Sequence, residues 1–279
     1  MAAINKRIFL LFPVLLFAFV SSEGVCGTIR TTVTSHVTVL STGQTNIQYV
    51  IKNTGDDTAH HVSVATFLAL EAQKSDSLGS NPPGGVIRYD CVLTPPDLKP
   101  GNYTLVTRIS FDEHGGTAHR AYHFSPLPWR LDQVKDARPA LSVEMSEPSF
   151  NTKSFWQPGG KVKLVLKNGS SSAIQPVVTF YLPDGFMIQE PERSYQLAAG
   201  ERKEEMIPLT MDASVKETRS FQVVAWYELN GAHHSQLIEG KIKVEEKPIY
   251  FKVFLILGGA ILVGFVIRML RRKKSGTKV

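Results

Sequence analysis

The feature that most constrains this 279-residue chain is the apolar run near each end. At the N-terminal end, a basic pair, Lys6 and Arg7, precedes an apolar run over residues 8–20, and the small residue Ser22 follows soon after. This order of segments is typical of a secretory signal, so the sequence predicts a signal peptide over residues 1–22. Cleavage after Ser22 keeps Cys26, whereas cleavage after Gly27 removes it, and both remain open.

The second apolar run predicts a membrane anchor. Residues 249–270 form a stretch of about the length that crosses a ~30 Å hydrocarbon core as a helix. Its charged residues, Lys252 and Arg268, lie near the ends, where long basic side chains reach the headgroups. The sequence therefore predicts a transmembrane helix over residues 249–270, with Ala260 and Gly264 as a face on which a second helix can pack. The weaker alternative is a buried core helix.

Basic residues fix the predicted orientation. Residues 271–279 form a basic tail, and the positive flank of the anchor consists of Lys252, Arg268, Arg271, Arg272, Lys273 and Lys274. Positive charge favours the cytoplasmic side, so we expect a single-pass protein in the lipid bilayer with a cytoplasmic C-terminus. The N-terminal domains are then extracytoplasmic, whether periplasmic, extracellular or lumenal, and the host remains open.

The overall charge is misleading for this chain. Of the net charge of +6, the signal carries +2 and residues 252–279 carry +7, which leaves −3 for the part between them. The basic isoelectric point therefore reflects membrane topology, and we expect no nucleic-acid partner.

An internal repeat divides the middle of the chain into two domains. Residues 47–53 match residues 162–168 position by position, and an asparagine ends each segment. A polar turn and a second apolar run follow in both copies, and each copy closes with a hairpin, around residues 112–116 and around Asn230-Gly231. A repeated unit of about 100 residues is typical of tandem domains.

The pattern within each repeat is that of β-structure. Ile47, Tyr49 and Ile51 alternate with polar residues, which is the period-2 pattern of a sheet with one buried face. Turn residues recur every 8–12 positions, and Asn-Gly favours a two-residue hairpin turn. The sequence predicts an all-β fold of two tandem Ig-like antiparallel β-sandwiches of about seven strands each. The predicted boundaries are 28–125 for the first sandwich, 126–139 for a Pro-containing linker with Trp129 between the domains, and 140–246 for the second sandwich.

The two strand and turn motifs carry a resemblance to a known group. The segment from Asn53 through the polar turn to the strand at 61–64, and the second copy with 182–186 and 197–201, resemble the CARDB and NEW3 group of Ig-like modules of cell-envelope proteins. The resemblance implies an adhesion, spacer or carbohydrate-associated role.

Candidate chemistry is sparse. Cys26 and Cys91 can form a disulfide if Cys26 is retained; otherwise Cys91 is a buried thiol. We expect His119 and His123 on one solvated face of a strand, with Tyr122 and Phe124 on the opposite, buried face. The two histidines are too far apart along the backbone to share a metal ion, so we expect no metal and no cofactor. No nucleophile elbow, zinc-protease motif or phosphate-binding loop occurs, and we expect a non-enzymatic protein.

The remaining candidates concern contacts. Asn102 and Asn168 begin glycosylation sequons, which matter if the host is eukaryotic. The segments 76–85 and 186–195 are predicted loops that a partner can meet. We expect an extracytoplasmic binding or scaffolding protein that contacts a protein partner through its sandwiches. The alternative is a surface adhesion or carbohydrate-binding module, with Trp156, Trp226 and Tyr227 as the aromatic residues that could face a glycan.

Overall fold

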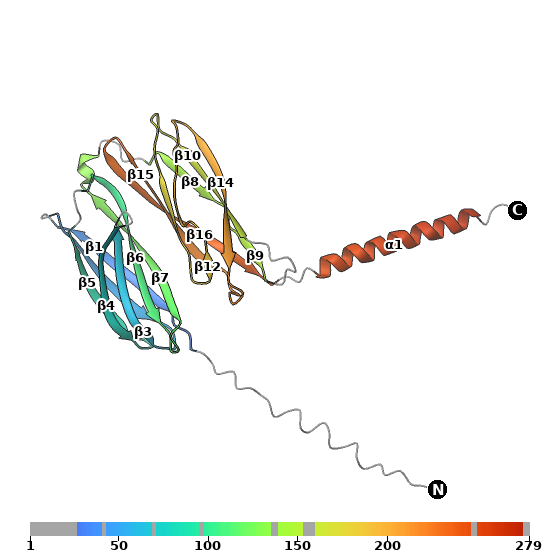
Figure 1. Ribbon diagram of the computed structural model, residues 1–279, viewed down its shortest axis with the longest axis horizontal. Coiled ribbons are helices and arrows are strands. Elements are labelled where there is room, and N and C mark those ends of the chain that lie inside the picture. The colour runs from blue at the N-terminus through green and yellow to red at the C-terminus, as the bar shows by residue number, and fades with distance from the viewer. Residues whose placement is uncertain are drawn as a thin grey trace, which may run out of the picture.

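The computed structural model describes residues 27–40, 43–68, 71–94, 98–134, 139–152, 160–246 and 250–275, with the backbone alone for 71–73, 250–252, 266 and 268–275. Two β-sandwiches lie side by side, one built from β1–β7 and the other from β8–β16, and helix α1 follows the second (Figure 1). The predicted all-β fold of the middle region is confirmed. The predicted signal peptide lies outside the described residues.

The first domain contains seven strands, which are β1 (Thr31–Val39), β2 (Thr45–Asn53), β3 (Ala59–Leu68), β4 (Glu71–Asn81), β5 (Val86–Leu93), β6 (Gly101–Asp112) and β7 (Ala118–Trp129). One sheet has the order β1-β2-β5, and the facing sheet contains β4, β3, β6 and β7. All pairs within these sheets are antiparallel. Inward side chains such as Ile47, Tyr49 and Ile51 are almost fully buried, as the alternation of residues predicts.

The second domain is built from β8 (Leu141–Met145), β9 (Ser149–Asn151), β10 (Gly160–Asn168), β11 (Val177–Tyr181), β12 (Phe186–Met187), β13 (Glu192–Ser194), β14 (Arg202–Met211), β15 (Arg219–Leu229) and β16 (Ala232–Glu245). Its outer sheet has the order β12-β14-β10-β8, and the facing sheet contains β13, β11, β15 and β16. The turn between β15 and β16 has positive φ at both Asn230 (53°) and Gly231 (76°), which is the hairpin geometry that the Asn-Gly pair predicts.

The chain continues into α1 (Tyr250–Ser275). Over the residues that the structure describes, no helix combines the length and apolar composition needed to cross a bilayer. The apolar side chains along α1 are exposed, and Phe254, Ile256 and Ile261 have 74%, 72% and 72% of their surface accessible. A short 3₁₀ turn, η1 (Leu131–Gln133), lies between the two sandwiches.

The repeated asparagine has a structural role in the first domain. Asn53 is fully buried, and its side-chain Nδ2 donates to the carbonyls of Asp57 (2.7 Å) and Asn81 (3.0 Å). Its Oδ1 accepts a hydrogen bond from the backbone N–H of Gly55 at 3.0 Å. The amide thus satisfies backbone groups of the turn that leaves β2 and ties this turn to the end of β4.

Asn168 repeats this arrangement 115 positions later. It is fully buried, donates from Nδ2 to the carbonyls of Ser172 (2.8 Å) and Ala198 (2.9 Å), and accepts from the N–H of Ser170 at 2.9 Å. The two copies therefore share the turn after the strand as well as the strand itself.

Two predicted boundaries are wrong. The linker was expected to begin at residue 126, but β7 continues through Pro126 and Pro128 to Trp129, opposite the start of β6. Ser125, Leu127 and Trp129 alternate inward and are buried in the first domain, so Trp129 packs in a domain core. The expected loop at 76–85 is also strand as far as Asn81, because Asn81 forms a buried hydrogen bond to Ile51 and pairs with β3.

Candidate functional site

The two sandwiches meet where β16 continues the sheet of the first domain. Strand β3 pairs with β6 only from Leu105 onward, so the first residues of β6 lack that neighbour. Strand β16 lies there in parallel, with His233 opposite Gly101, and the His233 N–H donates to the carbonyl of Pro100 at 2.9 Å. Gly101 has φ 150°, and a Cβ at this position would lie 2.0 Å from the His233 carbonyl oxygen. The close approach of the two backbones therefore requires glycine.

Ring stacking reinforces this junction. The imidazole of His233 lies parallel to the Tyr103 ring, with centroids 3.8 Å apart, and the Trp226 ring is 5.4 Å away. His233 is 4% exposed and Tyr103 is 5% exposed. Burial lowers the pKa of His233 to about 4 and raises the pKa of Tyr103 to about 12. Both rings are therefore neutral at physiological pH, because burial disfavours the charged form of each.

A second aromatic contact lies farther along the junction. Tyr181 of β11 packs edge-on against Tyr122 and Phe124 of β7, with centroid distances of 5.1 and 5.3 Å. Between the two aromatic groups, the side chains of Val106 and Val224 are nearly fully buried. The outer faces of two sheets thus pack on each other, which explains why these outward-facing positions are apolar.

Polar contacts surround this apolar contact. The Asp184 carboxylate accepts from the backbone N–H of Arg120 at 3.0 Å and lies 3.2 Å from Nδ1 of His119. Lys99 forms an ion pair with Glu228, and both side chains are about half exposed, so this pair contributes little stability. We call the whole contact the interdomain joint, and its residues are Lys99, Gly101, Tyr103, Thr104, Val106, His119, Arg120, Tyr122, Phe124, Tyr181, Asp184, Val224, Trp226, Glu228, His233 and Ser235.

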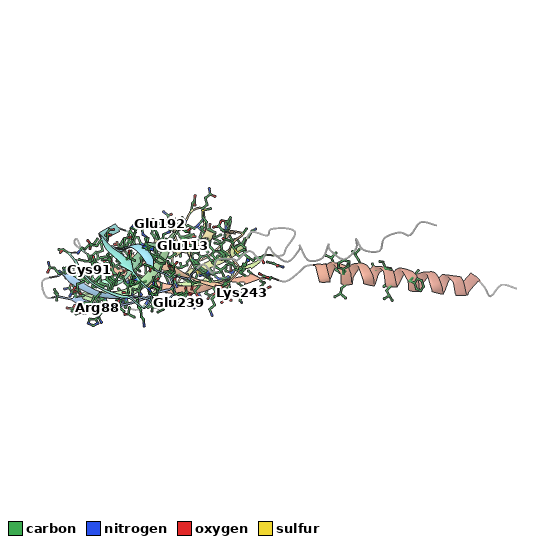
Figure 2. The ribbon with its side chains drawn as sticks, turned by 90° about the horizontal axis from the view of Figure 1, so that it is seen from below. Arg88, Cys91, Glu113, Glu192, Glu239 and Lys243 are labelled. Atoms are coloured by element: carbon green, nitrogen blue, oxygen red, sulfur yellow. The ribbon has the colours of Figure 1, made fainter. Side chains whose placement is uncertain are left out.

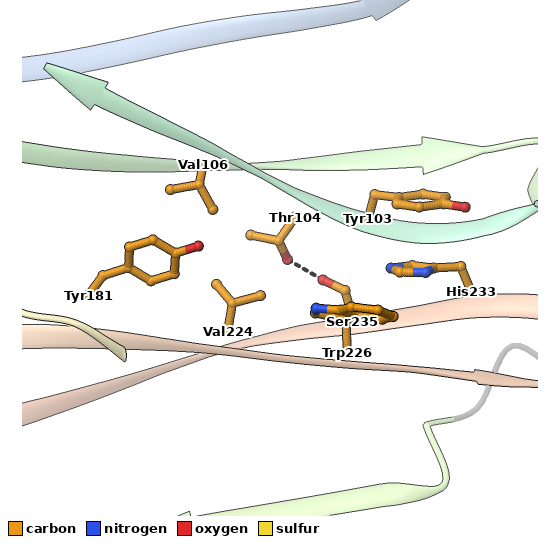
Figure 3. Close-up of a pocket in the computed structure, with 8 residues that line it drawn as sticks. All are labelled: Tyr103, Thr104, Val106, Tyr181, Val224, Trp226, His233 and Ser235. Carbon is orange, nitrogen blue, oxygen red and sulfur yellow. Dashed lines mark hydrogen bonds between the residues drawn. The ribbon is translucent and has the colours of Figure 1, made fainter. Parts of the chain in front are cut away.

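The joint contains a small crevice (Figure 3). It is lined by residues of β6, β11, β15 and β16, and Thr104 and Ser235 hydrogen-bond across it. The free space in it is about the size of one water molecule. Such a space holds no organic substrate, so the crevice belongs to the packing of two domains.

The outer sheet of the second domain presents a different kind of surface. Met187 and Met206 are 65% and 55% exposed, and Pro208 is also exposed between them along β12 and β14. Lys163 and Glu204 form an ion pair beside them, at 2.7 Å. We call this surface the methionine face. Exposed methionines adapt to the shape of a protein partner, and they are enriched at interfaces.

The structure places several predicted site residues in new surroundings. Cys91 is fully buried and has no disulfide within the described residues, and Cys26 lies outside them, so their pairing stays a prediction. Asn102 is partly exposed on β6 and stays a glycosylation candidate. Asn168 was also a candidate, but its amide is fully buried and bonded to three carbonyls, so the folded protein does not offer this site.

The histidine prediction is partly wrong. His123 was expected on a solvated face, yet it points between the sheets and its Nε2 lies 2.8 Å from the Ser35 hydroxyl. Burial lowers the pKa of His123. Tyr122 and Phe124, which were expected to be core residues, lie instead at the interdomain joint. Aromatic residues on the outer face of a strand indicate that something covers this face. The sequence alone did not show whether the core of the same domain or a neighbouring domain covers it.

The aromatic residues proposed for glycan binding lie elsewhere. Tyr227 is 1% exposed, and its hydroxyl accepts a hydrogen bond from the N–H of Ala140 at 2.6 Å. Trp226 is half-buried in the joint, and Trp156 lies outside the described residues. For the anchor, Ala260 and Gly264 lie four residues apart on α1, and Lys252, Arg268, Arg271, Arg272, Lys273 and Lys274 lie within its bounds.

No protein-family model and no curated protein matches this chain. Among solved structures, it is similar to a protein of unknown function from Porphyromonas gingivalis W83, at 14% identity over 77% of this chain and 99% of that chain, with a TM-score of 0.33. It is also similar to an ASH/PapD-like domain of human CEP192, at 12% identity over 40% of this chain and 92% of that chain, with a TM-score of 0.28. Trypsin-activated alpha-2-macroglobulin of Escherichia coli is 9% identical over 78% of this chain and 18% of that chain, with a TM-score of 0.31.

Proposed function

We propose that this chain is a non-enzymatic, membrane-anchored scaffolding protein whose two sandwiches hold a protein partner outside the cytoplasm. The interdomain joint is the observation that carries this proposal. Backbone pairing at Gly101 and stacking of Tyr103, His233 and Trp226 give the two domains one relative orientation. Two domains held in one orientation present a surface of defined shape. Binding to such a surface does not require the domains to be ordered first, so less free energy of binding is lost.

Within the surface that the two domains present together, the methionine face is the part of the second sandwich that we assign to the partner. Met187 and Met206 are the most exposed large apolar residues of the second domain, and they lie away from the joint on the opposite sheet. Charged neighbours, Lys163 and Glu204, provide a polar rim. An apolar centre with a polar rim is typical of protein interfaces.

The anchor is part of the proposal. It rests on the apolar run of residues 249–270, the basic residues that follow it, and the predicted signal at residues 1–22. The apolar side chains of α1 are exposed to solvent, and an apolar phase such as a bilayer would remove them from water. The resemblance to CARDB and NEW3 modules, with their spacer or adhesion role, fits a protein of this plan.

In-cell crosslinking of the tagged full-length protein tests this function. We expect one stoichiometric protein partner, captured equally by a version whose residues 249–270 are replaced with a foreign membrane span. The double variant Met187→Glu/Met206→Glu should lose the partner, because two buried charges would lack counterparts at the interface. The matched control is Lys167→Glu, which makes the same total change in charge at the other end of the same sheet, opposite Arg202. A partner lost on the span exchange, or kept by the methionine variant, would contradict this assignment.

A further inference from the structure

Strand β5 is a free edge of the first domain. In the described residues it pairs with β2 alone, in the sheet order β1-β2-β5. The opposite edge strand, β1, is different, because Ser35 hydrogen-bonds to Ser125 of β7 at 2.6 Å. Figure 2 shows Arg88 and Cys91 of β5 near one end of the two-domain body, with Lys243 near the other. The edge belongs to the three-stranded sheet of the first domain and the methionine face to the four-stranded sheet of the second, so an occupant of the edge is independent of the partner proposed for that face.

The hydrogen-bond pattern shows which backbone groups of β5 are unpaired. The Asn53 N–H donates to the Gly85 carbonyl at 3.0 Å, and residues 53 and 85 are opposite each other in this register. Hydrogen-bonded pairs alternate along an antiparallel ladder, so Ile87, Tyr89 and Cys91 direct their N–H and C=O groups toward β2. The backbone groups of residues 86, 88, 90 and 92 therefore point to the free edge. An edge of this kind can accept another strand.

The side chains of these same four residues form a symmetric pattern. Val86, Arg88, Asp90 and Val92 are all exposed on the outer face of the sheet, and the two valines are 44% and 48% exposed. In this series of four residues a valine stands at each end, and the two residues between them carry opposite charges. An antiparallel copy of β5 centred on Tyr89 would place Val86 opposite Val92, and Arg88 opposite Asp90, twice.

We propose that β5 pairs with β5 of a second copy of this chain, with a twofold axis at Tyr89. The two three-stranded sheets would then join into one sheet of six strands, through backbone hydrogen bonds between Arg88 of one copy and Asp90 of the other. A twofold contact of this type is isologous, since the same patch is used on both subunits. Opposite charges directly across an antiparallel pair stabilise it.

Other registers are disfavoured by the same residues. A centre at Arg88 places two arginines opposite each other, and a centre at Asp90 places two aspartates opposite each other. A centre at Ile87 places Val86 opposite Arg88, and one at Cys91 places Asp90 opposite Val92. Shifts of one residue between the chains turn outward side chains inward and are excluded by the pleat. Charged residues on a free edge usually prevent the edge from pairing with another strand. Arg88 and Asp90 instead permit pairing of two β5 strands in the register centred on Tyr89.

Charge exchange in the full-length protein tests this pairing. Two differently tagged chains are co-expressed, crosslinked in the membrane and purified through one tag. Wild-type chains should co-purify, whereas Arg88→Asp with itself and Asp90→Arg with itself should each lose at least about tenfold, because each places like charges opposite each other. Arg88→Asp co-expressed with Asp90→Arg should recover the pair, since both contacts then join opposite charges. The double variant Arg88→Asp/Asp90→Arg should also pair with itself.

The control is Lys52→Glu, an exposed residue of β2 on the same face but away from the edge, which should pair as wild type. Recovery in the mixed combination shows that both single variants fold, and a thermal melt of each purified variant checks this directly. Wild-type chains that do not co-purify, folded single variants that pair as well as wild type, or a mixed pair that stays as weak as the single variants would each overturn the proposal. Association through the Ala260 and Gly264 face of α1 would leave all combinations equal, and so would also overturn it.

Discussion

The rings of Tyr103 and His233 lie 3.8 Å apart and within 4° of parallel, although the two residues belong to different domains. His233 also pairs through its backbone with Gly101, so one residue contributes both a sheet bridge and a ring contact. The relative position of the two sandwiches depends on this small set of residues. It is therefore sensitive to changes that leave each sandwich intact.

Acid should weaken the protein through His233. Burial lowers the pKa of this imidazole from 6.5 to about 4, and the charged groups near it are Glu228, Lys99 and His234. A lowered histidine pKa means that the unfolded chain binds the proton more readily than the folded chain. The free energy of unfolding therefore keeps its full value above pH 6.5 and decreases as the pH falls toward 4. The loss is roughly 3 kcal/mol for this shift. Thermal unfolding of wild type and His233→Gln between pH 4 and 7.5 measures it.

In that comparison the wild-type curve should fall more steeply with decreasing pH than the His233→Gln curve. The seven other histidines are common to both proteins and cancel in the difference. Two parallel curves would show that His233 does not carry this contribution.

Gly101→Ala should open the joint. The new Cβ would lie 2.0 Å from the His233 carbonyl oxygen, so the two backbones would have to separate. Gly200→Ala is the control, because Gly200 also has a positive φ, of 72°, but open space around it, and its cost is limited to about 1 kcal/mol of backbone strain. Limited proteolysis should cleave Gly101→Ala between the domains, near Arg130, much faster than wild type. Equal cleavage of both glycine variants would contradict this role for Gly101.

The sequence predicted the two sandwiches but not how they meet. Alternation in residues 47–53 and 162–168 identified the strands because one face of each is buried. The same signal cannot separate a sheet face covered by its own sandwich from one covered by a neighbouring domain, so Tyr122 and Phe124 were assigned to a core. Backbone conformation at Gly101 and the bridge to His233 depend on residues 132 positions apart, and no local pattern reports such a contact.

Replacement of the repeated asparagine should destabilise the second domain. Asn168→Ala removes bonds to three carbonyls and to the Ser170 N–H and leaves buried backbone groups unsatisfied, which costs about 2–4 kcal/mol. Ser171→Ala, in the same turn, is exposed and should change the free energy of unfolding by less than about 0.5 kcal/mol. Chemical denaturation of the two variants measures the difference. An Asn168→Ala variant as stable as wild type would show that the buried amide is not needed.

Proline substitution should distinguish the two sides of β5. Arg88→Pro removes an N–H that points to the free edge, so the monomer should lose little stability. Ile87→Pro removes an N–H that bonds to β2, and should cost about 3 kcal/mol or more. Thermal unfolding of both variants measures this. Equal losses would mean that the hydrogen-bond alternation along β5 has been assigned the wrong way.

The fixed orientation of the two sandwiches is the claim on which the proposed function rests, and a distance distribution measures it most directly. Spin labels at Thr34→Cys and Lys161→Cys, in the outer sheets of the first and second domains, report on it in the full-length protein with Cys26 and Cys91 replaced by alanine. We predict one narrow distance distribution at pH 7.5, which broadens in the Gly101→Ala variant. A broad distribution in the protein that retains Gly101 would show two independently moving domains and contradict the fixed joint.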